Sequence, residues 1–102
     1  MEKKASRIKI TVLRCFDTKE VFKDPPIKTR VTAQCSIFKE GQVFHVDDIN
    51  MPSGFCPYAW YVISPSVYML MCGGNSPGYE PGVTVACCPD GLRPVVFKLE
   101  RE

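Results

Sequence analysis

The sequence lacks an apolar run long enough to cross a bilayer, for which about 18 residues are needed. The nearest stretch, Tyr58 to Met71, is broken by Ser64-Pro65-Ser66, so we predict no membrane span. The start of the chain also lacks the apolar run of a secretory signal, because Met1 to Arg7 is mostly charged. We therefore expect the protein in the reducing cytoplasm, where thiols stay free.

The chain also lacks a Cys-x-x-Cys pair and has a single histidine, although it contains six cysteines. Neither a zinc ribbon nor a thioredoxin-type site is therefore supported. The net charge is only +2, with no basic stripe interleaved with aromatics, which disfavours nucleic-acid binding. With 45% hydrophobic and 24% charged residues, the composition is that of a globular protein. We expect one domain over residues 1–102, with 1–6 as a flexible tail.

Charge is absent from one part of the chain, since no Asp, Glu, Lys or Arg occurs from Ile49 to Tyr79. Within this charge-free segment, proline stands twice where it favours the start of a helix, and Gly73-Gly74 is a stop signal. We predict two short helices, about 57–63 and 65–72, bent at Pro65. Because both are apolar on nearly all sides, either a second copy of the chain covers segment 49–79 or the helices line a pocket.

Alternating apolar residues predict strands on both sides of the charge-free segment. Ile8, Ile10 and Val12 alternate with polar residues, and Asp17 can cap a short helical turn after them. The predicted strands are about 7–12, 42–47, 83–88 and 94–100, and the stretch 29–33 is also expected to be extended. These elements predict an α+β fold, with a small, mostly antiparallel sheet or partial barrel covered by the proline-bent pair of helices.

Cys56 is the leading candidate for a reactive group, because it directly precedes Pro57 and so lies at or near the N-cap of the first predicted helix. Unpaired amides and the helix dipole at this position favour an anion, and hence the thiolate. Such a thiolate could act as a nucleophile, a redox centre or a metal ligand. The alternative is a small hydrophobic residue that packs under Phe55.

Three other cysteines are assigned from their place in the predicted elements. Cys72 ends the helical pair, where outward-pointing carbonyls disfavour a thiolate, so it is expected to be a packing residue. Cys15 follows the first strand and is expected to be structural. Cys35 lies in a connecting segment, where its side chain can point inward or outward.

Cys87 and Cys88 are adjacent on a predicted strand, so their side chains point to opposite faces. Cys87 shares its face with two valines and is expected in the core. Cys88 opens the turn Pro89-Asp90-Gly91 and is close in sequence to Asp90 and Arg93. A cation near this turn could stabilise a thiolate.

Aromatic side chains give the charge-free segment polar groups in apolar surroundings: Tyr58, Trp60, Tyr61 and Tyr68. This composition suits a small-molecule pocket as well as an oligomer interface. A Cys–His catalytic pair would have to use His45, which is mid-strand and is expected to face solvent.

Four elements of the sequence stand out together: Phe38-Lys39-Glu40-Gly41-Gln42-Val43-Phe44, Gly54-Phe55-Cys56-Pro57-Tyr58-Ala59-Trp60, Gly73-Gly74, and Cys87-Cys88-Pro89-Asp90-Gly91-Leu92-Arg93-Pro94-Val95-Val96-Phe97. Their combination resembles a family of small bacterial and archaeal proteins of about this length, for which no activity is established. The resemblance covers the chain from Ile8 onward, and its most distinctive motifs are Gly-x-Cys-Pro-x-Ala-Trp and Cys-Pro-Asp.

The resemblance implies that Cys35, Cys56 and Cys88 match three cysteines of the family. Many members have Cys-Pro-x-Gly-His where this chain has Cys35 to Lys39, so Lys39 replaces the histidine and weakens the case for a Cys/His metal site.

Three hypotheses for function follow, and the sequence does not decide whether the protein is an enzyme. The preferred one is a thiol-centred site that binds a soft transition metal or a cofactor, or performs redox or nucleophilic chemistry. The second is a homo-oligomer assembled through segment 49–79, and the third is a small enzyme with an aromatic pocket and an Asp, His or Tyr acid–base group. The candidate residues are Cys56, Cys88 and Asp90 for catalysis, Tyr58, Trp60, Tyr61 and Arg93 for ligand binding, and Cys35, Cys56 and Cys88 for a metal.

Overall fold

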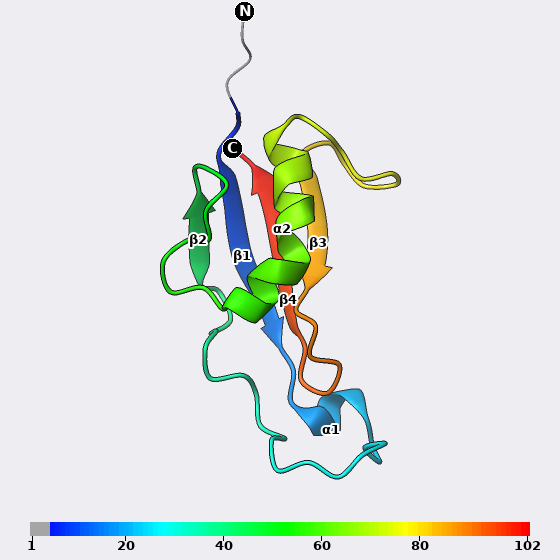
Figure 1. The fold of residues 1–102 in the computed structure, drawn as a ribbon. Coiled ribbons are helices and arrows are strands. Elements are labelled where there is room, and N and C mark those ends of the chain that lie inside the picture. The colour runs from blue at the N-terminus through cyan, green and yellow to red at the C-terminus, as the bar shows by residue number, and fades with distance from the viewer. Residues whose placement is uncertain (1–4) are drawn as a thin grey trace, which may run out of the picture.

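Four strands and two helices make up the computed structural model, which describes residues 5–102 (Figure 1). In chain order they are β1 (Ile8–Cys15), α1 (Thr18–Val21), β2 (Val43–Val46), α2 (Pro57–Met71), β3 (Val83–Cys87) and β4 (Val95–Arg101). The strands form one open antiparallel sheet in the order β2-β1-β4-β3, and α2 packs across one face of it. The predicted α+β fold is confirmed.

The predicted N-terminal tail covers residues 1–6. Residues 1–4 of the predicted tail lie outside the described residues, whereas Ser6 N donates a hydrogen bond to Met71 O at 3.1 Å. Within residues 5–102, no helix combines the length and the apolar character needed to span a membrane.

The core lies between α2 and the two central strands, β1 and β4. Alternate residues of each strand point toward α2, as the apolar pattern predicts, and Ile10 of β1 pairs with Leu99 of β4 and Phe44 of β2. The side chains that meet there are at most 1% exposed: Ile8, Ile10, Val12, Ile63, Val67, Leu70, Val95, Phe97 and Leu99. The faces of these strands could therefore be assigned from alternation alone.

α2 is one continuous helix through Pro65, so the prediction of two short helices is wrong. Pro65 is exposed and lies one turn after Tyr61, which is 82% exposed. The carbonyl of Tyr61, which loses its N–H partner at position 65, is therefore on the solvent side, where water can bind it. The predicted stop is confirmed, because Gly73 has φ 90° and Gly74 N donates to Met69 O at 2.8 Å.

A long loop separates α1 from β2. Asp17 caps α1 as predicted, because its side chain accepts from Glu20 N at 2.9 Å while the Glu20 side chain accepts from Asp17 N at 3.0 Å. No helix or strand follows until β2, and the stretch 29–33, expected to be extended, forms no strand. There Thr29 Oγ1 accepts a hydrogen bond from Val31 N at 3.1 Å, which favours a local turn.

β3 faces the opposite way from the prediction. Thr84 is only 6% exposed and Ala86 packs against the core, whereas Val85 is 47% exposed and Cys87 is exposed. Thr84 tolerates burial because its Oγ1 is hydrogen-bonded to Ser76 Oγ at 3.0 Å. Cys87 is therefore outside the core, and it is Cys88 that packs against it.

Candidate functional site

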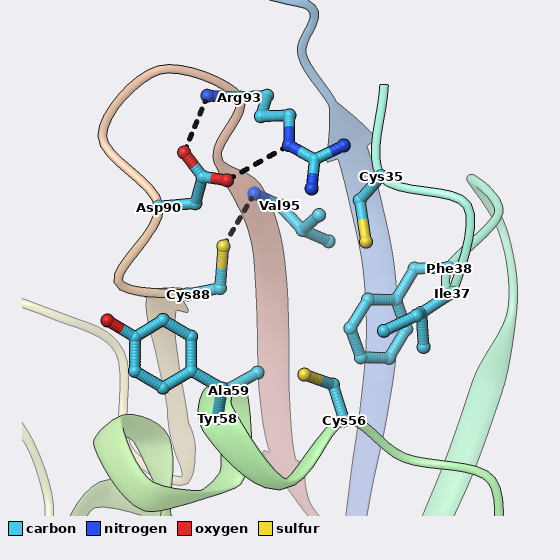
Figure 2. Close-up of a pocket in the computed structure, with 10 residues that line it drawn as sticks. All are labelled: Cys35, Ile37, Phe38, Cys56, Tyr58, Ala59, Cys88, Asp90, Arg93 and Val95. Atoms are coloured by element: carbon cyan, nitrogen blue, oxygen red, sulfur yellow. Dashed lines mark hydrogen bonds and ion pairs between the residues drawn. The ribbon is translucent and has the colours of Figure 1, made fainter. Parts of the chain in front are cut away.

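A pocket of about 190 Å³ lies at the end of the sheet where α2 begins. Its walls come from the loop before β2, from the start of α2 and from the turn between β3 and β4 (Figure 2). The lining residues are Cys35, Ile37, Phe38, Cys56, Tyr58, Ala59, Cys88, Asp90, Arg93 and Val95. Three cysteines from three distant segments thus share one cavity, which we call the thiol pocket.

Phe38 anchors the loop that brings Cys35 to this pocket. It is 4% exposed, and its ring lies 4.9 Å from that of Phe55 and 5.1 Å from that of Phe97, measured between centroids. Below it, Cys15 Sγ contacts Phe38 O at 3.7 Å. Edge-to-face aromatic packing therefore fixes a segment that has no regular secondary structure of its own.

Cys56 is the N-cap residue of α2, as predicted. Its backbone is extended, with φ −78° and ψ 122°, Pro57 occupies the first turn, and the Cys56 carbonyl accepts the hydrogen bond of Trp60 N at 2.9 Å. The Cys56 side chain makes no capping hydrogen bond. Figure 2 shows its sulfur pointing into the pocket, at the positive end of a 15-residue helix.

Cys88 ends the ladder between β3 and β4. Its N–H donates to Val95 O at 3.0 Å, and its Sγ accepts a hydrogen bond from Val95 N at 3.3 Å. Cys88 is thus held by two contacts with Val95, one through its backbone and one through its sulfur, which fix its orientation at the pocket wall.

Cys15 is a buried thiol near two of the pocket cysteines, Cys35 and Cys88. Burial raises the pKa of Cys15, and the nearby Glu40, Cys35 and Cys88 raise it further. Cys15 is therefore a neutral, 2% exposed thiol at ordinary pH, consistent with the structural role expected for it.

Asp90 and Arg93 form an ion pair in the turn that closes the pocket. Arg93 Nε donates to Asp90 Oδ2 at 3.0 Å, and Asp90 Oδ1 accepts from Leu92 N at 3.0 Å and Arg93 N at 3.1 Å. Partial burial alone would raise the pKa of Asp90, but these backbone and guanidinium hydrogen bonds hold it below its usual value. Because Asp90 is ionised and already accepts three hydrogen bonds, it is better suited to hold Arg93 in position than to transfer a proton.

Of the four residues predicted to bind a ligand, Tyr58 and Arg93 line the pocket. Tyr58 lines the pocket although it is 67% exposed, whereas Tyr61 and Trp60 do not line it. Trp60 packs instead against Phe55 and Tyr68, with ring centroids 5.9 and 6.2 Å away.

The remaining candidates lie elsewhere. His45 Nδ1 lies 2.7 Å from Glu102 Oε1 on the exposed face of β2, and His45 does not line the pocket. Cys72 is exposed, so its assignment as a packing residue is wrong. Cys87 is exposed as a residue, but partial desolvation of its thiol, and then the neighbouring Cys88, raise its pKa.

Across residues 5–102, no three His, Cys, Asp or Glu side chains are grouped closely enough to hold a metal ion. Cys35, Cys56 and Cys88 therefore share a cavity without forming a preorganised ligand set.

No protein-family model, curated protein or solved structure matches this chain. The fold and the pocket define a small α+β protein with a cysteine-lined cavity.

Proposed function

We propose that the thiol pocket is a reactive site in which Cys56 attacks a small electrophilic molecule. The observation that carries this proposal is the convergence of Cys35, Cys56 and Cys88 on one cavity. Apolar side chains such as Phe38 and Val95 complete the walls, and a few polar groups stand among them. This combination is typical of small-molecule sites.

Cys56 is the nucleophile because of its position at the start of α2. The backbone N–H groups of the first turn have no intrahelical acceptors, and the helix dipole adds partial positive charge there. Both effects favour negative charge that develops in front of the helix during the reaction, where the sulfur of Cys56 lies. Cys35 and Cys88 extend the soft, polarisable surface around the bound molecule.

The size of the cavity limits the substrate. An engineered cavity of about 150 Å³ holds a benzene molecule, so about 190 Å³ accepts a molecule only slightly larger. The part of the substrate that enters the pocket is therefore a small group.

The test compares two thiols at opposite ends of the same helix. Anaerobically purified protein is treated with limiting iodoacetamide at pH 7, and labelling of each cysteine is followed by peptide mass spectrometry. Cys56 is only partly exposed and Cys72 is exposed, so access alone favours Cys72. We expect Cys56 to react about five- to tenfold faster because of its helix position.

Faster labelling of Cys72 than of Cys56 would show that the helix position does not outweigh the lower exposure of Cys56, and would overturn the proposal. Metal analysis of the same sample tests the alternative occupant, since a stoichiometric soft metal that protects Cys35, Cys56 and Cys88 together would replace nucleophilic chemistry by metal binding.

A second candidate function is self-association through α2. Tyr58 and Tyr61 are 67% and 82% exposed on a helix that lies within the charge-free segment. A second copy would present the same uncharged surface, so a two-fold contact between the helices would bring no like charges together. This proposal is compatible with the first, because Tyr58 both lines the pocket and faces outward.

A further inference from the structure

We propose that the thiol pocket selects small carboxylates that carry an electrophilic carbon, with Arg93 binding the carboxylate and Cys56 attacking the carbon. This inference rests on the proposed function, because it requires a reactive Cys56, and it adds the class of substrate.

Arg93 is held in place to receive an anion. Its Nε donates to Asp90 Oδ2 at 3.0 Å and its Nη1 donates to Ala33 O at 3.3 Å. Figure 2 shows the guanidinium reaching from the turn toward Cys35, with a terminal nitrogen directed at the middle of the pocket. A guanidinium fixed on two sides loses little freedom on binding, and its planar fork of donors matches a carboxylate.

Asp90 does not occupy the position of the substrate anion. Its two oxygens already accept three hydrogen bonds, from Leu92 N, Arg93 N and Arg93 Nε, all within its own turn. In Figure 2 the guanidinium lies between Asp90 and Cys35, so the carboxylate of Asp90 is behind the donor rather than in front of it. Its role is to orient Arg93.

The start of α2 supplies further positive potential at the opposite wall. Tyr58 and Ala59, which line the pocket, belong to the first turn of the helix, and the Cys56 side chain does not cap their backbone N–H groups. The field of these groups favours an anionic substrate that faces them.

The walls between Arg93 and Cys56 define the rest of the substrate. Val95 and Phe38 offer apolar contact, and the cavity of about 190 Å³ leaves room for a short carbon skeleton. In the reaction, the thiolate of Cys56 forms a carbon–sulfur bond while the bond from that carbon to its leaving group breaks, and the leaving group departs with the bonding electron pair.

Iodoacetate and iodoacetamide provide matched probes, since they differ only in the charged group and both lose iodide. A free thiolate repels the carboxylate of iodoacetate, so an ordinary cysteine has no preference for the acid. At Cys56 of the full chain we expect iodoacetate to react about tenfold faster than iodoacetamide, as one charge-assisted contact allows. Exposed Cys72 serves as the internal control and should show no such preference.

Two arginine-to-glutamine variants test which arginine binds the carboxylate. Arg93→Gln should lower the ratio of acid to amide rates at Cys56, whereas Arg7→Gln, which changes an exposed arginine paired with Asp47, should keep it. On the unmodified protein, propionate but not propionamide should slow labelling of Cys56 by iodoacetamide, which tests the site even where Arg93→Gln does not fold.

The outcomes separate the two proposals. Labelling of Cys56 by iodoacetamide without a preference for iodoacetate, or without protection by propionate, overturns the carboxylate inference alone. Failure of both reagents at Cys56 while Cys72 reacts overturns the proposed function, and the carboxylate inference falls with it.

Discussion

Asp90 Oδ2 lies 3.0 Å from Arg93 Nε in the turn that closes the thiol pocket. The same turn presents Cys88, and Arg93 also contacts the carbonyl of Ala33 in the loop that carries Cys35. The ion pair thus holds in place the arginine that connects two of the three segments that form the cavity. Its strength should be measurable in the stability of the protein.

Asp90→Asn should lower the free energy of unfolding by about 1 kcal/mol at pH 7, a value kept small because a third of the carboxylate is exposed. The pKa of Asp90 is lowered in the folded state, chiefly through hydrogen bonds that overcome the opposing effect of burial. The stabilisation is therefore complete above the unfolded pKa, near 4, and is lost as the pH falls through the folded value. Urea unfolding from pH 7 down to pH 2 should show the two proteins converging in acid.

The matched control is Asp47→Asn, which removes an exposed partner of Arg7 in a 2.8 Å ion pair. Because Asp47 is 70% exposed, its loss should change stability by less than about 0.5 kcal/mol. An Asp90→Asn protein that differs from wild type equally at every pH would contradict an ionic role for Asp90.

Arg101 should stabilise the C-terminal end of α2. Its Nη1 donates to Leu70 O at 2.9 Å and to Gly74 O at 2.7 Å, and its Nη2 donates to Asn75 Oδ1 at 2.8 Å. Leu70 O lacks the regular helical partner four residues on, because Gly74 N donates to Met69 O instead. The guanidinium also opposes the negative end of the helix dipole. Arg101→Met should therefore cost about 2 kcal/mol in urea unfolding.

Lys98→Met is the control for this change, because Lys98 is on the same strand and contacts only Glu100 among the ion pairs of the described residues. This substitution should leave the free energy of unfolding almost unchanged. Equal losses in the two variants would show that Arg101 acts through general charge or β-strand propensity rather than by capping α2.

The parts of the site that follow local rules could be predicted from the sequence. Alternation placed Ile8, Ile10 and Val12 on the buried face of β1, and Pro57 identified Cys56 as the N-cap of α2. Both depend on neighbours within a few residues, for which propensity and pattern carry the information.

The parts that depend on distant contacts could not be predicted. Cys35 is in a loop without periodicity, and its place is fixed by packing of Phe38 on Phe55 and Phe97. On β3 the more apolar face is the exposed one, because Thr84 is satisfied by a hydrogen bond from a loop residue and can be buried. Tertiary context overrides the local pattern in both cases.

Pro65 should be a site where the protein can be stabilised. Because proline has no N–H, α2 lacks the hydrogen bond from residue 65 to Tyr61 O on its exposed side. Pro65→Ala should raise the free energy of unfolding by about 1–2 kcal/mol, which is less than the full cost of a helical proline because proline also restricts the unfolded chain. Pro57→Ala is the control, since proline is well suited to the first turn and its replacement should bring no gain. A Pro65→Ala protein of lower stability would show that the ring makes packing contacts that the helix needs.

Tyr61 tests self-association through α2. At 82% exposure, Tyr61 contributes little to the stability of a single chain, but it would be central to a contact between two α2 helices. We expect sedimentation velocity to show a dimer of the wild-type protein that dissociates in Tyr61→Lys, because a lysine at this position would place two like charges in an uncharged two-fold contact.

Leu13→Lys is the matched control, since Leu13 is 45% exposed on β1 rather than on α2. A wild-type protein that sediments as a monomer at all concentrations, or a Leu13→Lys variant that dissociates as fully as Tyr61→Lys, would exclude α2 as the contact surface. Iodoacetamide labelling of Cys56 in the Tyr61→Lys monomer would then show whether the thiol pocket works within one chain, because the residues that line it all come from a single copy.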